Sequence, residues 1–187
     1  AMNVASGSPV QWMSGAESFF LRAEAKLRWD LGATSAKDLY EQGIRTSFAE
    51  RGVGGADAYI ANSEAKPADF KDNSGGRRDA SAVSTITIAW NDNANFEQKL
   101  ERIITQKYLA IFPDGQEAWS EFRRTGYPKL FTINYNASSG AVSTDTQIRR
   151  LRFPTDEYSQ NAANVQAAVT LLGGQDNGNT KLWWDKK

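Results

Sequence analysis

The stretch that decides the fold is LERIITQKYLAIFPDGQEAWSEFRRTGYPKL, Leu100–Leu130. Apolar side chains recur in it at three- and four-residue spacing, which predicts two amphipathic helices. An Asn-x-x-Gln cap at Asn95 opens the first helix, and Pro113 ends it. A second cap at Asp114 opens the next helix, which ends at Gly126. The stretch therefore predicts a hairpin of two helices.

A second hairpin is predicted upstream. Its first helix opens on a Ser-x-x-Glu capping box at Ser14 and ends at Gly32. The second helix opens at Ser35 and contains Gly43, where Gly costs about 1 kcal/mol relative to Ala. We therefore expect a neighbouring helix to approach closely at Gly43. Aromatic residues on the helical stripes are expected to form the core: Phe20, Tyr40, Phe48, Tyr108, Trp119 and Phe122.

The rest of the chain is less regular. Residues 53–94 form an excursion rich in Gly and charged residues. It ends in an alternating stretch, Ser81–Trp90, which predicts a strand with one buried face. Residues 127–187 form a mixed region with a helix near 161–172. Two short extended pieces are also expected, 130–135 and 148–153.

Two helix hairpins of similar size, at about 14–52 and 95–126, are typical of a tetratricopeptide-like fold. We expect a mostly α protein with irregular loops and a few short β-strands. The sequence contains no good interdomain linker, so the whole chain, 1–187, is expected to form a single structural portion.

The composition excludes several kinds of chemistry. The 187 residues include no His and no Cys, which rules out Ser-His-Asp and Cys-His catalysis, thiolate zinc sites and disulfides. Lys plus Arg and Asp plus Glu are 22 each, so the chain lacks the basic excess of a nucleic-acid binder. No apolar run approaches the roughly 18–20 residues of a membrane helix. Residues 1–3 lack the basic and apolar regions of a signal peptide.

Carboxylates are the remaining candidates for catalysis, because glycosidases use a pair of them. Glu17 and Glu24 share one predicted helix, and Glu117 and Glu121 share another. Glu residues on helix surfaces are usually solvated or capping, and Glu17 and Glu117 occupy cap positions. We therefore expect no catalytic residue in the chain.

Two other groups of charged residues receive a structural interpretation. Four loop residues carry oxygens that could bind calcium, but they lack the ordered spacing of an EF-hand loop. They are expected to form solvated turns. No metal or cofactor is predicted. These oxygens belong to Asp69, Asp72, Asp92 and Asn93. Arginine clusters without excess positive charge are also expected to be structural. They are Arg77-Arg78, Arg123-Arg124 and Arg149-Arg150-Arg152.

Aromatic side chains are the best candidates for binding sugar, because the C–H faces of pyranose rings pack on aromatic planes. The chain has 6 Trp, 6 Tyr and 9 Phe, and most lie on helical stripes. Tyr59, Phe70 and Trp90 lie outside the stripes and are weak candidates for ligand binding.

Three segments of the chain are similar to segments of one known family. The first is SGAESFFLRAEAKLRWDLG, followed by LYEQGIRTSF. The second is ITIAW with the stretch quoted above, and the third is RRLRFPTDEYSQNAANVQAA, followed by LWWD. In this order and spacing they resemble the C-terminal part of the SusD/RagB family of outer-membrane lipoproteins. The resemblance covers nearly everything from Ser14 to Asp185 and implies that the chain corresponds to about the last third of a family member.

The resemblance implies a tetratricopeptide-like scaffold on the outer face of the outer membrane of Bacteroidetes-type bacteria, lipid-anchored in the full-length protein. It implies a non-catalytic component of polysaccharide utilisation that binds an oligosaccharide or polysaccharide. The expected protein partner is a SusC-like TonB-dependent transporter, which the family covers as a lid. Because upstream repeats would cover the first hairpin in a family member, at least one of Phe19, Phe20 and Trp29 is expected to be exposed. Trp183 and Trp184 match the family's closing segment and are expected to be packed.

Two alternatives remain open. A tetratricopeptide-like interaction module without its own sugar site predicts an exposed apolar surface that binds the transporter barrel in the absence of sugar. A carboxylate glycosidase predicts release of reducing ends, abolished by substitution of one Glu or Asp.

Overall fold

The computed structural model describes Gly7 and residues 11–185. Residues 1–3, considered above for a signal peptide, lie outside the described residues. The chain divides into two compact units. Unit 1 comprises residues up to Lys66 and Ile86–Ala118, and unit 2 comprises Pro67–Thr85 and the residues from Trp119 onward. No helix in the described part of the chain is long and apolar enough to cross a membrane.

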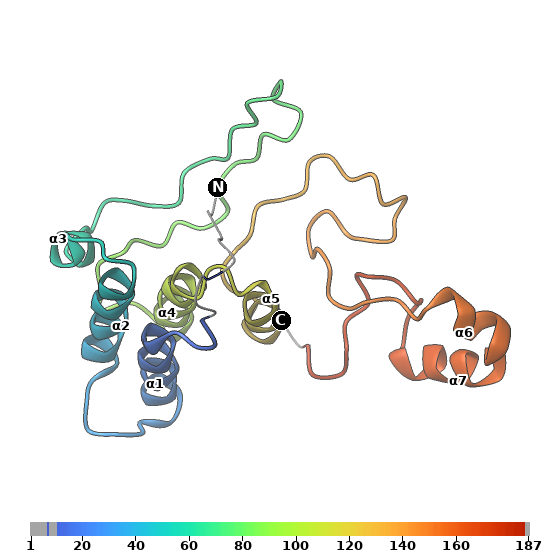
Figure 1. Ribbon diagram of the computed structural model, residues 1–187, viewed down its shortest axis with the longest axis horizontal. Coiled ribbons are helices and arrows are strands. Elements are labelled where there is room, and N and C mark those ends of the chain that lie inside the picture. Colours follow the sequence, from blue (N-terminus) through green and yellow to red (C-terminus); the bar gives the residue numbers. More distant parts are fainter. Residues whose placement is uncertain (1–6, 8–10, 186–187) are drawn as a thin grey trace. The chain divides into compact units, whose positions relative to one another are not determined.

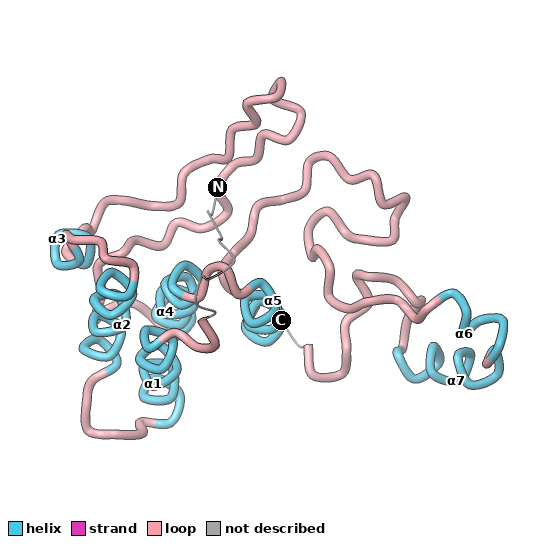
Figure 2. Tube along the Cα trace, viewed as in Figure 1, coloured by secondary structure: helices cyan, strands magenta, loops and turns pink. Residues whose placement is uncertain are grey.

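Helices provide the regular structure, and the segments between them are loops (Figure 2). The described residues form α1 (Gly15–Trp29), α2 (Ala36–Glu50), α3 (Ala56–Ile60), α4 (Phe96–Ala110), α5 (Gly115–Thr125), α6 (Thr155–Gln160) and α7 (Ala162–Leu172). The predicted mostly α fold is confirmed, and α1 and α2 pack together as the first predicted hairpin. The pairing of α4 with α5 as a second hairpin stays a prediction. The short α3 and α6 were not predicted, because five or six residues are too few to show a helical period.

In unit 1, helices α1, α2 and α4 lie side by side (Figure 1). The ring of Phe20 from α1 meets the ring of Tyr40 from α2 edge-on, with centroids 6.2 Å apart. Apolar residues of α4 complete this core and are buried: Leu100, Ile103 and Ile104. Of the other aromatic residues expected to be packed, Phe48 and Tyr108 are half-buried in unit 1. In unit 2, Phe122 is buried and Trp119 is half-buried.

Gly43 explains how closely α1 and α2 approach. A Cβ atom added at Gly43 would lie 2.8 Å from the Phe20 ring, so a side chain at this position would force the ring to shift. The predicted close approach at Gly43 is confirmed.

The helix caps follow the sequence in three cases and depart from it in one. Asp114 accepts a hydrogen bond from the Glu117 amide at the start of α5, at 3.0 Å. Asn95 and Gln98 form the predicted capping box of α4, and Ser35 accepts a hydrogen bond from the Asp38 amide at α2. At α1 the predicted Ser-x-x-Glu box is wrong, since the Ser14 side chain makes no cap hydrogen bond. The Gly15 amide instead donates to Glu50 at the end of α2, at 2.6 Å. Glu50, which is distant in sequence, therefore takes the place of the local Ser14 cap.

The predicted strand Ser81–Trp90 is wrong, because its backbone groups bond to helices and loops rather than to another strand. The Tyr40 hydroxyl donates to the carbonyl of Ile88 at 2.6 Å. The Arg102 Nε donates to the carbonyl of Thr87 at 3.0 Å. The alternating pattern of residues 81–90 therefore identified an extended segment, which contacts helices instead of pairing with a strand.

In unit 2, helices α6 and α7 contact each other, and α7 agrees with the predicted helix near 161–172. The extended pieces predicted at 130–135 and 148–153 contain no strand. Pairing between extended segments within the described residues is limited to isolated bridges: Phe70 with Ala80 and Ser143 with Gln147.

Two buried arginines and one half-buried arginine organise unit 2, as expected for structural clusters. Arg149 donates through Nε to Asp185 at 2.7 Å, and both side chains are buried. Arg150 pairs with Asp176, also in a buried position. The guanidinium of Arg123 lies 3.6 Å from the Trp119 ring centroid. The structural interpretation is confirmed for these three arginines.

The closing tryptophans differ from each other. Trp184 is half-buried, and its ring lies 4.9 Å from the Arg123 guanidinium. Trp183 is 82% exposed, so the prediction that it is packed is wrong. Adjacent residues in an irregular segment point in different directions, and only Trp184 meets the arginine cluster.

Candidate functional site

Tyr59, the first predicted binding residue, has a structural role in unit 1. It lies on α3, and its ring packs on Phe48 with centroids 5.3 Å apart. Its hydroxyl donates to Gln106 Oε1 at 3.1 Å. Both the ring and the hydroxyl are thus engaged with helices of the same unit.

Trp90, the second candidate, is also half-buried in unit 1. Its ring packs on Tyr40 with centroids 5.4 Å apart, and its indole N–H donates to Asp92 at 2.9 Å. Burial raises the pKa of Tyr40, so this phenol stays neutral in the core. Trp90 therefore covers the helix core and has little free surface for a sugar.

Phe70, the third candidate, lies in unit 2, so the structure does not place the three candidates in one unit. Its side chain is 46% exposed, and its backbone pairs with Ala80. The ring of Phe131, which is 38% exposed, lies nearby with a centroid distance of 6.1 Å and an angle of 48° between the planes. Two phenyl rings are thus presented together on loops.

A third ring and a cation extend this surface. Tyr135 is 39% exposed, and the Arg77 guanidinium lies 3.5 Å from its ring centroid. The side-chain amide of Asn134 donates to the carbonyl of Asp79, which ties the two loops together. We call Phe70, Arg77, Phe131 and Tyr135 the aromatic patch.

Three members of the aromatic patch were not predicted to bind a ligand: Phe131 and Tyr135 were not singled out, and Arg77 was expected to be structural. Phe131 and Tyr135 are four residues apart in a predicted extended piece, a spacing that places side chains on the same side of an extended chain. That spacing was the available signal. The contact with Arg77 carried no sequence signal, because it joins two loops more than fifty residues apart.

Acidic side chains beside the aromatic patch bond to the loop that carries Arg77. Asp72 accepts from the Ser74 hydroxyl and amide, which lower the pKa of Asp72. Asp79 accepts from the Asp72 amide at 2.7 Å, and this hydrogen bond lowers the pKa of Asp79. Lys71 lies 3.3 Å from Asp79. These carboxylates hold the turn in shape.

The other loop oxygens considered for calcium also serve local structure. Asp69 accepts from the Ala82 amide at 2.9 Å, and Asp92 accepts from Trp90. No group of three or more acidic side chains in the described residues is placed to hold a metal ion.

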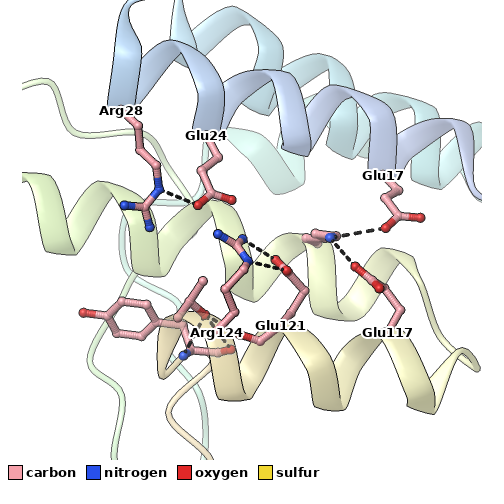
Figure 3. A network of polar contacts seen from close by, with 9 residues as sticks. Glu17, Glu24, Arg28, Glu117, Glu121 and Arg124 are labelled. Atoms are coloured by element: carbon pink, nitrogen blue, oxygen red, sulfur yellow. Dashed lines mark hydrogen bonds and ion pairs between the residues drawn. The ribbon is translucent and has the colours of Figure 1, made fainter. Parts of the chain in front are cut away.

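The glutamates considered for catalysis are held in ion pairs (Figure 3). In unit 1, Lys107 Nζ lies 3.2 Å from Glu17 and 2.8 Å from Glu117, and the lysine is buried. Figure 3 also shows Glu24 paired with Arg28. In unit 2, both carboxylate oxygens of Glu121 accept from Arg124, at 2.7 and 2.8 Å. The cap role expected of Glu17 is wrong, because this carboxylate pairs with Lys107.

Unit 1 has an apolar cavity of about 620 Å³ between the ends of α2 and α4. Its lining includes Phe48, Val53, Leu109, Phe112 and Pro113. On α1, Trp29 is 66% exposed, which confirms the expectation of an exposed aromatic residue on the first hairpin. Phe20 is buried and Phe19 is half-buried.

Comparison with solved structures gives close matches. A SusD homologue from Bacteroides uniformis has a TM-score of 0.89 and 45% identity over 99% of this chain and 39% of that chain. A chitin-binding SusD homologue from Flavobacterium johnsoniae has a TM-score of 0.80 and 48% identity over 91% and 35%. A SusD homologue from Bacteroides thetaiotaomicron has a TM-score of 0.85 and 43% identity over 99% and 40%. The chain thus spans no more than 40% of the length of these three relatives.

Comparison with protein-family models identifies the family of the chain. No curated protein matches the chain. The SusD-like family, described as Susd and RagB outer membrane lipoprotein, matches residues 1–185. The chain therefore belongs to the SusD/RagB family.

Proposed function

We propose that this protein is a non-catalytic glycan-binding component of an outer-membrane nutrient-uptake system. The observation that carries the proposal is the aromatic patch, in which Phe70, Phe131 and Tyr135 are each more than a third exposed. Large apolar rings beside polar loop groups match the chemistry of a sugar, which has C–H faces and hydroxyl edges. The chitin-binding relative supports a glycan as the ligand class.

The proposal includes a SusC-like TonB-dependent transporter as the protein partner and the outer surface of the outer membrane as the location. Membership of an outer-membrane lipoprotein family supports both. The non-catalytic role is supported by the ion pairs of the candidate glutamates, since a glycosidase needs one carboxyl group free to transfer a proton.

Affinity electrophoresis through gels that contain a polysaccharide tests the proposal. We expect the chain to be retarded in at least one gel of a neutral and acidic panel. Phe70→Ala and Phe131→Ala should each weaken the retardation roughly tenfold, the effect expected of a central aromatic contact. Phe96→Ala is the matched control, because Phe96 is 39% exposed and lies in unit 1. Absence of retardation across the panel, or equal losses in all three variants, contradicts the proposal.

A protein-interaction module is the second candidate function, favoured by the apolar cavity of unit 1. Exposed apolar surfaces of this kind are typical of protein contacts. If the cavity binds the transporter, Leu109→Asp should abolish co-purification with a co-expressed SusC-like protein in the absence of sugar. Leu151→Asp is the control, because Leu151 is 75% exposed and belongs to unit 2.

A further inference from the structure

Arg77 is held in place by a ring rather than by a carboxylate. Its guanidinium lies 3.5 Å from the Tyr135 centroid, a distance typical of cation–π stacking. The side chain is exposed, and no ion pair or hydrogen bond joins it to another described residue. The stacked face is covered, whereas the N–H groups at its edge remain available to a ligand.

The acidic residues around Arg77 are satisfied by other groups. Asp79 has Lys71 at 3.3 Å and the Asp72 amide at 2.7 Å. Asp72 accepts from Ser74 and from the amide of Arg78 at 3.2 Å. Because these carboxylates form the turn itself, the Arg77 guanidinium remains able to pair with something outside the chain. Arg78 lies farther from the Tyr135 ring, at 6.0 Å, and its charge helps to lower the pKa of Asp72.

A guanidinium that is stacked on one face and has no ionic partner is suited to bind an anionic group with two oxygens. Its planar fork forms two parallel hydrogen bonds with a carboxylate or with two oxygens of a sulfate or phosphate ester. Stacking on Tyr135 restricts the rotamers of Arg77 before binding, which lowers the entropy lost when a ligand is bound. A rigid arginine with no partner on a surface is thus a recognition element for an anion.

Each phenyl ring of the aromatic patch lies a few residues along the chain from one member of the stacked pair, Phe70 from Arg77 and Phe131 from Tyr135. Phe131 and Tyr135 are four residues apart, so their Cα atoms are separated by at most about 14 Å. A short oligosaccharide can span this distance, with a sugar ring on Phe70 and Phe131 and a charged substituent at Arg77.

We propose that the aromatic patch binds an acidic glycan, whose sugar ring packs on Phe70 and Phe131 while its carboxylate or sulfate group pairs with Arg77. The inference rests on the proposed glycan-binding function and adds the ligand class and the residue that selects it. It departs from the structural role that the sequence predicted for the Arg77-Arg78 cluster.

The test compares matched polymers in affinity gels. Polygalacturonate is paired with its methyl ester, which removes the charge of the carboxylate. Sulfated carrageenan is paired with agarose, a neutral galactan. We expect at least one anionic polymer to retard the chain tenfold more strongly than its neutral counterpart, and added salt to weaken this retardation. The pair that responds distinguishes a carboxylate from a sulfate ligand.

Variants assign the preference to Arg77. Arg77→Gln should weaken binding of the anionic polymer about tenfold or more, and Arg77→Lys should restore only part of it, because Lys keeps the charge without the planar fork. Tyr135→Leu should weaken binding by a smaller factor, since it frees the guanidinium. Arg22→Gln is the matched control, because Arg22 is an exposed arginine 5.6 Å from the Phe19 ring in unit 1. Circular dichroism spectra should be unchanged in all four variants.

The outcomes separate this inference from the proposed function. Binding of neutral polymers alone, or anionic binding that Arg77→Gln leaves unchanged, overturns the acidic-glycan inference while glycan binding stands. Absence of binding to every polymer, neutral or anionic, contradicts the proposed function and the inference together.

Discussion

Glu50, the last residue of α2, caps the first helix at Ser14: its Oε2 accepts from the Ser14 hydroxyl at 2.7 Å. The other carboxylate oxygen accepts from the amide of Gly15. One negative charge thus lies at the positive end of the α1 dipole and satisfies an amide that has no partner within the helix. The contact joins the start of α1 to the end of α2 and so fixes the hairpin at its open end.

Glu50→Ala removes this cap. We expect the free energy of unfolding to fall by about 1–2 kcal/mol, the usual cost of losing an N-cap acceptor. Urea unfolding followed by far-UV circular dichroism measures the change. Glu64→Ala is the control, because Glu64 is exposed and bonds only within its own loop. Equal midpoints for the two variants would show that the cap contributes nothing to stability.

Gly43→Ala tests the close approach of α1 and α2. Ala is normally the better helix former by about 1 kcal/mol, but its Cβ would lie 2.8 Å from the Phe20 ring. We expect a loss of about 1–3 kcal/mol in unfolding free energy, the cost typical of overpacking in a core. Thermal and urea unfolding report it. Gly115→Ala meets no atom within 4 Å and should leave stability unchanged or raise it; a gain at Gly43 would refute the packing argument.

Local sequence rules predicted the helices well and failed where a distant partner decided the outcome. The Asn95 cap needs only its neighbour Gln98, and the structure has it as expected. Glu17 satisfies the same kind of rule, yet Lys107 pairs with it. Helix periodicity locates Lys107 on α4 but does not reveal which carboxylates of α1 and α5 will face it.

The same limit applies to the candidate site. Phe70 was identified because it lies in an irregular segment, and that criterion also selected Tyr59 and Trp90, which pack on helices. Phe70 differs from Tyr59 and Trp90 in that its side chain is exposed. Exposure of a ring depends on which part of the chain covers it, and the local sequence does not show this. The contact between Phe70 and Phe131 joins segments about sixty residues apart, so no local sequence pattern predicts it.

Lys107 tests the importance of a buried charge in unit 1. Its side chain is 1% exposed and pairs with Glu17 and Glu117. Lys107→Met keeps most of the volume but leaves two carboxylates without their cation, so we expect a loss of about 3 kcal/mol in unfolding free energy. Urea unfolding measures the loss, and Lys66→Met at an exposed loop position is the control.

A double variant shows whether that loss is electrostatic. Adding Glu17→Gln to Lys107→Met removes one of the two stranded charges and should recover part of the stability. If the double variant is as unstable as the sum of the two single variants, lost packing rather than lost charge pairing explains the effect.

Asp176 should make the stability of unit 2 sensitive to acid. Burial alone would raise the pKa of Asp176, but hydrogen bonds from Arg150, Tyr158 and the Phe153 amide outweigh it and lower this pKa. A carboxyl group whose pKa is lower in the folded state contributes stability above its unfolded pKa of about 3.9. That contribution is lost as the pH falls through the lower, folded pKa.

Asp176→Asn removes the charge that compensates buried Arg150, so we expect unfolding free energy at neutral pH to fall by about 3 kcal/mol. The difference from the unsubstituted chain should shrink as the pH drops below about 4, because protonation then removes the same charge. Urea unfolding at a series of pH values measures both effects. Asp145→Asn, at an exposed loop position of the same unit, should follow the unsubstituted chain throughout. A difference that stays constant down to the lowest pH would mean that the ionised carboxylate of Asp176 is not what stabilises Arg150.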